Sequence, residues 1–251
     1  SSGGCFPQGV GSFGARRMKL ALIPARGGSK RIPRKNIRFF RDKPMIAWSI
    51  NAARAAGCFD RILVSTDDDE IAEVARSFGA EVPFLRPAHL ADDKTTTQAV
   101  VIHAVQWCEQ QGLDPHAVCC LYATAPFVQP ADLVEAGLLL EQAPTSSFVF
   151  PVTSFPFPIQ RAIRIDTAGR SVMFQPQHFN TRSQDLDEAF HDAGQFYWAR
   201  PEAWISSVNI FDDACPLILP RWRVQDIDTE EDWLCAEQLH HLMEQRIDMN
   251  E

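Results

Sequence analysis

Residues 19–142 alternate between short apolar runs and segments of helical periodicity, and this alternation constrains the fold more than any other feature. Four strand–helix pairs in succession predict a doubly wound α/β domain with a mostly parallel sheet. Expected strands are 19–24, 61–65, 81–85 and 117–122, and expected helices are 44–56, 68–78, 95–111 and 130–142. Ligands of such folds bind beyond the carboxyl ends of the strands. The loops after Pro24, Ser65, Leu85 and Tyr122 should therefore share one face.

The pattern changes at both ends of this region. Residues 1–17 are rich in Gly and Ser and have no apolar core, so we expect a disordered leader or tag before a domain that begins at Met18. We expect a single domain over 18–245, with an insertion at about 150–192 and a tail over 246–251. The insertion should contain a hairpin around Gly169 and form a lid or an oligomer contact. A strand over 193–199 and a helix over 229–244 should follow.

Charge and composition exclude several classes of protein. The formal net charge of −8 disfavours a nucleic-acid partner. No apolar run reaches the length of a membrane-spanning helix, so no membrane association is expected. Seven cysteines without a CxxC motif fit reduced thiols in a cytoplasmic protein. Eight Lys and Arg residues nevertheless fall within 26–43, and such a local basic segment points to a small polyanion such as a nucleoside triphosphate.

The basic segment begins directly after the first expected strand, with a glycine turn. Gly27 and Gly28 would let the backbone approach a phosphate closely, and Arg26, Lys30 and Lys35 add positive charge. The turn matches neither a Walker A loop nor G-x-G-x-x-G, which disfavours a dinucleotide-dependent dehydrogenase. The alternative is an ordinary basic surface turn.

The second chemical feature is Asp226-Ile227-Asp228, near the C-terminus. If this segment is a strand, both carboxylates point to one face and Ile227 to the other. Two carboxylates suit Mg²⁺, which completes its shell with phosphate oxygens and water. The alternative is an acidic N-cap for the helix that follows Thr229.

These motifs together resemble the CMP-sialic acid synthetase family of cytidylyltransferases. The glycine turn fits R-G-G-S-K-x-x-x-x-K-N, and further matches follow in the order of the family at 64–67, 85–87, 124–127, 182–186 and 226–228. The resemblance implies a Rossmann-like nucleotidyltransferase fold, CTP as substrate, Mg²⁺ as cofactor and a homodimer. It also implies that an acidic nine-carbon keto-sugar receives the nucleotide.

The resemblance assigns roles by motif position. The nucleotide would contact Ala25, Arg26, Gly27, Gly28, Ser29, Lys30, Lys35, Asn36, Arg86 and Thr96. The sugar would contact Tyr122, Thr124, Arg182, Gln195 and Tyr197, with Arg182 gripping its carboxylate. Asp226 and Asp228 would hold Mg²⁺, and catalysis would rest on Arg26, Lys35 and Asp228.

Three segments depart from the usual sialic acid pattern and look like the pseudaminic acid branch of the family. They are 121–127, 155–161 and 191–198. Tyr122 stands where a glutamine is common, and a polar change in a sugar pocket discriminates strongly between substrates. Transfer to sialic or legionaminic acid, and a non-catalytic nucleotide-binding protein, remain alternatives; an octulosonate transferase fits less well. The resemblance also suggests a role in flagellin or surface-polysaccharide glycosylation.

Overall fold

The computed structural model describes residues 17–145, 147–206 and 209–248. Within these residues a central sheet of seven strands has the order β11-β6-β10-β5-β1-β4, and β9 pairs with β6 outside this path. The strands are β1 (Met18–Pro24), β4 (Arg61–Ser65), β5 (Pro115–Leu121), β6 (Val149–Ser154), β9 (Phe190–Asp192), β10 (Phe196–Ala199) and β11 (Cys215–Ile218). β2 (Phe39–Phe40) and β3 (Lys43–Pro44) form a separate small hairpin.

The sheet is mostly parallel, as predicted. β1 pairs in parallel with β4 and β5, and β11 pairs in parallel with β6. β10 runs antiparallel between β5 and β6, and β9 is antiparallel to β6. The parallel half therefore presents the carboxyl ends of β4, β1 and β5 at one edge, where ligands of such folds bind.

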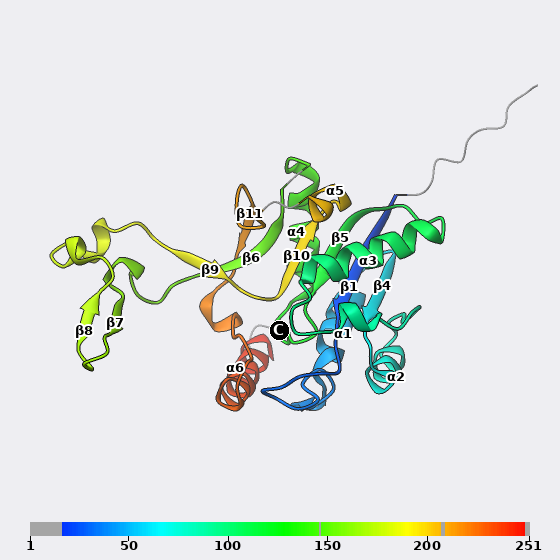
Figure 1. Ribbon diagram of the computed structural model, residues 1–251, viewed down its shortest axis with the longest axis horizontal. Coiled ribbons are helices and arrows are strands. Elements are labelled where there is room, and N and C mark those ends of the chain that lie inside the picture. The colour runs from blue at the N-terminus through cyan, green and yellow to red at the C-terminus, as the bar shows by residue number, and fades with distance from the viewer. Residues whose placement is uncertain (1–16, 146, 207–208, 249–251) are drawn as a thin grey trace, which may run out of the picture.

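Helices cover both faces of the sheet (Figure 1). One face packs against α1 (Met45–Ala56), α2 (Asp69–Ser77) and α4 (Pro130–Gln142), and the other against α3 (Thr97–Gln110) and α5 (Pro201–Ile205). The side chains of β1 alternate between the two cores: Ala21 and Ile23 face the first, and Leu20 and Leu22 the second. The four predicted helices of this region are confirmed to within two residues at each end.

The predicted strand over 81–85 is wrong. The chain makes only two isolated bridges there, Leu63 with Glu81 and Thr66 with Leu85. Pro83 has no backbone N–H, so it interrupts the ladder between these two contacts. The segment still runs beside β4 and delivers Arg86 to the ligand-binding edge.

The predicted helix over 229–244 is α6 (Glu230–Asp248), and it packs into a third, smaller core beside the sheet. The buried residues of this core are Ile32, Phe40, Met45, Phe127, Ile227, Trp233, Ala236 and Met243. Ile32 follows the glycine turn and Ile227 lies between the two predicted metal ligands. The core therefore ties the N-terminal turn to the C-terminal aspartates.

An arm, residues 155–189, projects from the body (Figure 1). It holds the hairpin β7 (Ile163–Ile165) with β8 (Ser171–Met173) and the 3-10 helices η2 (Ile159–Arg161), η3 (Pro176–His178) and η4 (Ser183–Asp185). β6 and β9 pair at its base, so the projecting part contains fewer residues than the predicted insertion of about 150–192. Among the described residues, no helix is long and apolar enough to cross a membrane.

Candidate active site

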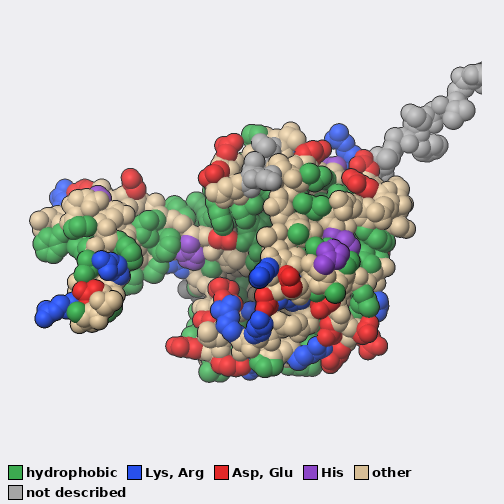
Figure 2. Space-filling model, viewed as in Figure 1, with side chains coloured by type: hydrophobic (Ala, Val, Ile, Leu, Met, Phe, Trp, Pro, Cys, Tyr) green, Lys and Arg blue, Asp and Glu red, His purple; other side chains and the backbone are tan. Residues whose placement is uncertain are grey.

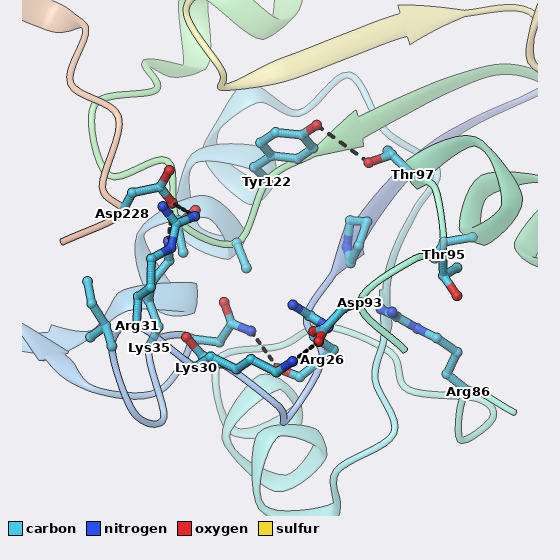
Figure 3. A pocket seen from close by; sticks show the side chains of 17 residues that line it. Arg26, Lys30, Arg31, Lys35, Arg86, Asp93, Thr95, Thr97, Tyr122 and Asp228 are labelled. Atoms are coloured by element: carbon cyan, nitrogen blue, oxygen red, sulfur yellow. Dashed lines mark hydrogen bonds and ion pairs between the residues drawn. The ribbon is translucent and has the colours of Figure 1, made fainter. Parts of the chain in front are cut away.

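A cavity of about 530 Å³ opens beyond the carboxyl ends of β1 and β5, and its volume is typical of a small-molecule site (Figure 3). Nine of the predicted site residues line it: Arg26, Ser29, Lys30, Lys35, Asn36, Arg86, Tyr122, Thr124 and Asp228. The structure thus brings together residues from the first strand loop, the middle of the chain and the C-terminal region. Their individual roles stay predictions.

The glycine turn is held in place by side chains on both sides. The backbone N–H of Gly27 donates to Oδ1 of Asp67 (2.9 Å), and Nδ2 of Asn36 donates to the carbonyl of Arg26 (2.9 Å). A Cβ on Gly27 would lie 2.8 Å from Oδ2 of Asp68, whereas a Cβ on Gly28 would meet nothing within 4 Å. A side chain at position 27 would therefore press on Asp68, whereas the space beside Gly28 is open.

The cations of the turn are paired with carboxylates from distant parts of the chain. Arg26 and Lys30 both contact Asp93. Nη2 of Arg31 lies 2.9 Å from Oδ1 of Asp228, and Nζ of Lys35 lies 3.5 Å from the same oxygen. Nζ of Lys35 also donates to the carbonyl of Ile227. Figure 3 shows Arg31 and Lys35 beside Asp228. The N-terminal turn and the C-terminal aspartate therefore converge on one cavity.

The segment of Asp226 and Asp228 is not the strand that we predicted, but its side chains do alternate. Ile227 is buried in the α6 core, while Asp226 is exposed and Asp228 lines the cavity. The N-cap alternative is wrong for Asp228, because Thr229 takes that position: its hydroxyl accepts from the N–H of Asp232 (3.2 Å). Oδ2 of Asp232 accepts in turn from the N–H of Asp228 (3.1 Å) and of Thr229 (2.8 Å).

Asp228 fits the predicted Mg²⁺ site better than Asp226 does. Its carboxylate faces the cavity and is 38% exposed, so it could meet a metal that is also bound by phosphates. Oδ1 of Asp226 accepts from the N–H of Ile227 (2.9 Å), and Asp226 does not line the cavity. The described residues contain no group of three or more metal-binding side chains. Phosphate oxygens and water would have to supply the other ligands.

Arg86 lies in the wall of the cavity and is held rigidly. It is buried, and its Nε donates to Oγ of Ser65 (3.0 Å) while Nη2 donates to the Ser65 carbonyl. Burial lowers the pKa of its guanidinium, and the nearby Asp67 partly offsets this effect. Arg86 therefore provides a fixed positive charge, and its Nη1 reaches only the carbonyl of Leu90 (3.4 Å).

Two of the residues predicted to contact the nucleotide, Ala25 and Thr96, do not line the cavity. The N–H of Ala25 donates to the carbonyl of Ser65 (2.9 Å), and its methyl group is buried in the core. Thr96 is the N-cap of α3, where its hydroxyl accepts from the N–H of Ala99 (3.2 Å). The neighbours Thr95 and Thr97 line the cavity instead. Gly27 and Gly28 also do not line the cavity, although their sequence neighbours Arg26 and Ser29 do.

Tyr122 and Thr124 line the cavity, but the other predicted sugar contacts on the sheet lie behind them. The ring of Tyr197 packs against that of Tyr122 at 5.4 Å, and its hydroxyl donates to Asp192. Gln195 is buried, and its Nε2 donates to the carbonyl of Arg223 (2.8 Å). Tyr197 and Gln195 therefore support the wall that Tyr122 presents, and the structure does not show them in the cavity.

Arg182 does not reach the cavity of its own chain. It lies on the arm, where its side chain is 73% exposed and pairs with Asp185 at 2.9 Å. Its predicted contact with the sugar carboxylate is therefore wrong within a single chain.

Four polar residues line the cavity without having been assigned as site residues: Arg31, Asp93, Thr95 and Thr97. Arg31 belongs to the basic segment and Thr95 and Thr97 flank the predicted Thr96, so the sequence contained a signal for these three. Asp93 carries no such signal, because nothing in the sequence of this polar loop distinguishes it from its neighbour Asp92.

This chain is similar to known proteins over most of its length. Residues 20–200 match the family described as Cytidylyltransferase. A pseudaminic acid cytidylyltransferase of Campylobacter jejuni subsp. jejuni serotype O:23/36 is 46% identical over 85% of this chain and 92% of its own length. A CMP-N,N'-diacetyllegionaminic acid synthase of Legionella pneumophila is 33% identical over 91% of this chain and 98% of its own length.

The fold has relatives among solved structures as well. CMP:2-keto-3-deoxy-manno-octonic acid synthetase complexed with CTP superposes with a TM-score of 0.65 and 16% identity, over 91% of this chain and 99% of that one. At this identity the likeness concerns the fold alone. The match over 20–200 and the 46% identical relative are decisive for the family: this chain belongs to the cytidylyltransferases.

Proposed function

We propose that this chain transfers CMP from CTP to pseudaminic acid, a nine-carbon acidic sugar, and releases pyrophosphate. One observation carries the proposal: the cations of the glycine turn and Asp228 line one cavity, in a chain that is 46% identical to a pseudaminic acid cytidylyltransferase. Tyr122 in the wall of the same cavity supports the choice of sugar, since it departs from the pattern expected for sialic acid.

In the proposed reaction the anomeric oxygen of the sugar bonds to the α-phosphorus of CTP. The bond from this phosphorus to the bridging oxygen breaks, the electron pair leaves with pyrophosphate, and the proton of the anomeric hydroxyl passes to water. Arg26, Lys30 and Lys35 offset the negative charge that grows on the leaving group, so most of the catalysis is positioning and electrostatic stabilisation. A magnesium ion held by Asp228 and the phosphates would add further charge neutralisation.

The proposal includes a homodimer formed through the arm. Its side chains are unusually apolar for a surface, as Figure 2 shows along the projecting part of the molecule. The exposed apolar residues of the arm are Phe155, Phe157, Ile159, Ile163, Ile165, Val172, Phe174 and Phe179. We propose that a second copy covers these residues, and that this dimer places Arg182 of the partner subunit in the cavity, which Arg182 of the same chain does not reach. We also propose a cytoplasmic location, which fits the free thiols of all described cysteines.

The proposal is tested by pyrophosphate release from the purified protein with each nucleoside triphosphate and each of three sugars: pseudaminic, legionaminic and sialic acid. We expect release only with CTP, fastest with pseudaminic acid. Asp228→Ala should lower turnover by about a hundredfold or more, because a charge that stabilises the transition state is lost. Asp226→Ala, at the acid that does not line the cavity, is the matched control.

Two results would contradict the proposal. Faster pyrophosphate release with legionaminic acid than with pseudaminic acid would show that legionaminic acid is the preferred sugar. Binding of CTP without release over any of the sugars would indicate a nucleotide-binding protein that is not an enzyme.

A further inference from the structure

The loop of residues 88–96 is joined to the glycine turn by one acidic side chain. This loop contains η1 (Ala88–Leu90) and leads into α3. Oδ1 of Asp93 pairs with Nη1 of Arg26, and Oδ2 of Asp93 pairs with Nζ of Lys30. Figure 3 shows the Asp93 carboxylate beside Arg26 and Lys30. Among the described residues, Asp93 is the acid that forms ion pairs with both of them.

The turn on which Asp93 sits is held by its own neighbour. Oδ1 of Asp92 accepts from the backbone N–H of Lys94 (3.0 Å) and of Thr95 (2.8 Å), and from the hydroxyl of Thr95 (2.7 Å). These bonds keep the local shape without any help from Asp93. The contacts of Asp93 across the cavity are therefore separable from the stability of its loop.

The two ion pairs occupy the groups that a triphosphate needs. Arg26 and Lys30 are cavity-lining cations of the glycine turn, and charge-assisted bonds to phosphate are their expected use. The contacts with Lys30 and then Arg26 lower the pKa of Asp93, so its carboxylate is ionised at neutral pH. A triphosphate carries more negative charge and more acceptor oxygens than one carboxylate, so it competes for the same N–H groups with an advantage.

We propose that Asp93 is a latch, whose carboxylate holds Arg26 and Lys30 in the empty site and is displaced by the triphosphate of the incoming nucleotide. The inference rests on the proposed function, because it takes the cavity to be a triphosphate site. Displacement frees the loop that carries Thr95, a residue of the cavity wall. When pyrophosphate leaves, Asp93 pairs with both cations again. The same side chain therefore weakens the binding of the triphosphate and favours the release of pyrophosphate.

The test is calorimetric binding to Asp93→Asn without sugar or metal, with inorganic tripolyphosphate and CTP as separate probes. Exposed ion pairs are individually weak, so removal of the competing carboxylate should tighten both ligands by roughly three- to tenfold. Cytidine, which has no phosphate, should bind the variant and the wild type equally. Inhibition by pyrophosphate should strengthen by the same factor as tripolyphosphate binding.

Asp92→Asn is the matched control, because it removes the same charge one residue away and its amide oxygen can still accept the bonds of the turn. We expect its affinities to stay within about twofold of the wild type, as for most surface substitutions. Equal tightening in both variants would overturn the latch, since it would show a general charge effect. Unchanged or weaker binding of tripolyphosphate by Asp93→Asn would overturn it as well.

The design separates failure of the latch from failure of the proposed function. If Asp93→Asn binds tripolyphosphate more tightly but neither protein prefers CTP to UTP or ATP, the latch stands and the assigned nucleotide is wrong. If both proteins bind CTP selectively and with equal affinity, the assigned nucleotide stands and the latch is refuted.

Discussion

Gly27 and Gly28 of the glycine turn differ in what surrounds them, and this difference yields a prediction. A methyl group on Gly27 would press on the Asp68 carboxylate, so Gly27→Ala should lower the free energy of unfolding by about 1–3 kcal/mol. Gly28→Ala meets open space, so its stability should stay within about 0.5 kcal/mol of the wild type. If a phosphate approaches the backbone at Gly28, the KM for CTP should rise in this variant.

Urea unfolding and steady-state kinetics on the two variants check the prediction, with each serving as the control for the other. A Gly28→Ala protein with wild-type stability and wild-type KM would show that no ligand comes close to this position. Loss of stability in Gly28→Ala would show that the open space is filled in the folded protein.

The sequence predicted the charged residues of the glycine turn as site residues, but it could not show which of the other side chains face the cavity. Arg26, Lys30 and Lys35 were recognisable from their charge and spacing, and the structure places all three in the cavity wall. In the run 95–97 the sequence offers three threonines, and only the start of α3 decides that Thr96 caps the helix. Asp93 could not be recognised, because its importance depends on cations 63 and 67 residues away.

At the scale of elements, Asp68 links α2 to the glycine turn, because it has one role in each. Asp68 is the N-cap of α2, where Oδ1 accepts from the N–H of Ile71 (3.0 Å), and it pairs with Arg34. Hydrogen bonds from Arg34, followed by that of Ile71, lower the pKa of Asp68 below its ordinary value of 3.8. The pairing therefore stabilises the protein above about pH 4, and the contribution is lost as the pH falls through the lowered pKa.

Asn is as good an N-cap as Asp, so Asp68→Asn isolates the ion pair from the cap. Because both partners are partly exposed, we expect a loss of about 1 kcal/mol or less in the free energy of unfolding at pH 7. The difference from the wild type should narrow below pH 4. Urea titrations at several pH values measure it, with Asp68→Ala as a control that should lose about 1 kcal/mol more. A difference that is constant down to pH 3 would contradict this assignment.

Elements with strong local signals were predictable, and those that depend on distant partners were not. α4 begins and ends at the predicted residues, because Pro130 fixes its start and its apolar residues repeat with helical spacing. β9 and β11 were missed, since each is a short strand defined by its pairing with β6. The Asp226–Asp228 segment alternates like a strand without being one, because Ile227 is anchored by the α6 core and not by a ladder.

At the scale of the whole molecule, the arm was predictable as a break in the pattern but its direction was not. Pro156 and Pro158 mark where the chain leaves the sheet, whereas the pairing of Ser154 with Phe190 sets its base. The arm projects away from the body (Figure 1), and Arg182, at the start of η4 on this arm, does not line the cavity that Asp228 lines. If Arg182 contacts the substrate while the arm keeps this position, it must do so in the cavity of a second copy.

This requirement predicts complementation between two inactive variants. We expect Arg182→Ala and Asp228→Ala to be inactive alone, because every site of such a dimer lacks either the arginine or the aspartate. In a dimer of one chain of each kind, the Arg182→Ala chain keeps its own Asp228 and receives Arg182 of the partner subunit, so one site is complete. Random re-pairing of equal amounts should restore about a quarter of the wild-type pyrophosphate release per site. Arg170→Ala, at an exposed arginine in the β7–β8 turn of the arm, is the control, and it should retain activity alone. Sedimentation must show dimers throughout, and dimeric mixtures that stay inactive would exclude a shared site.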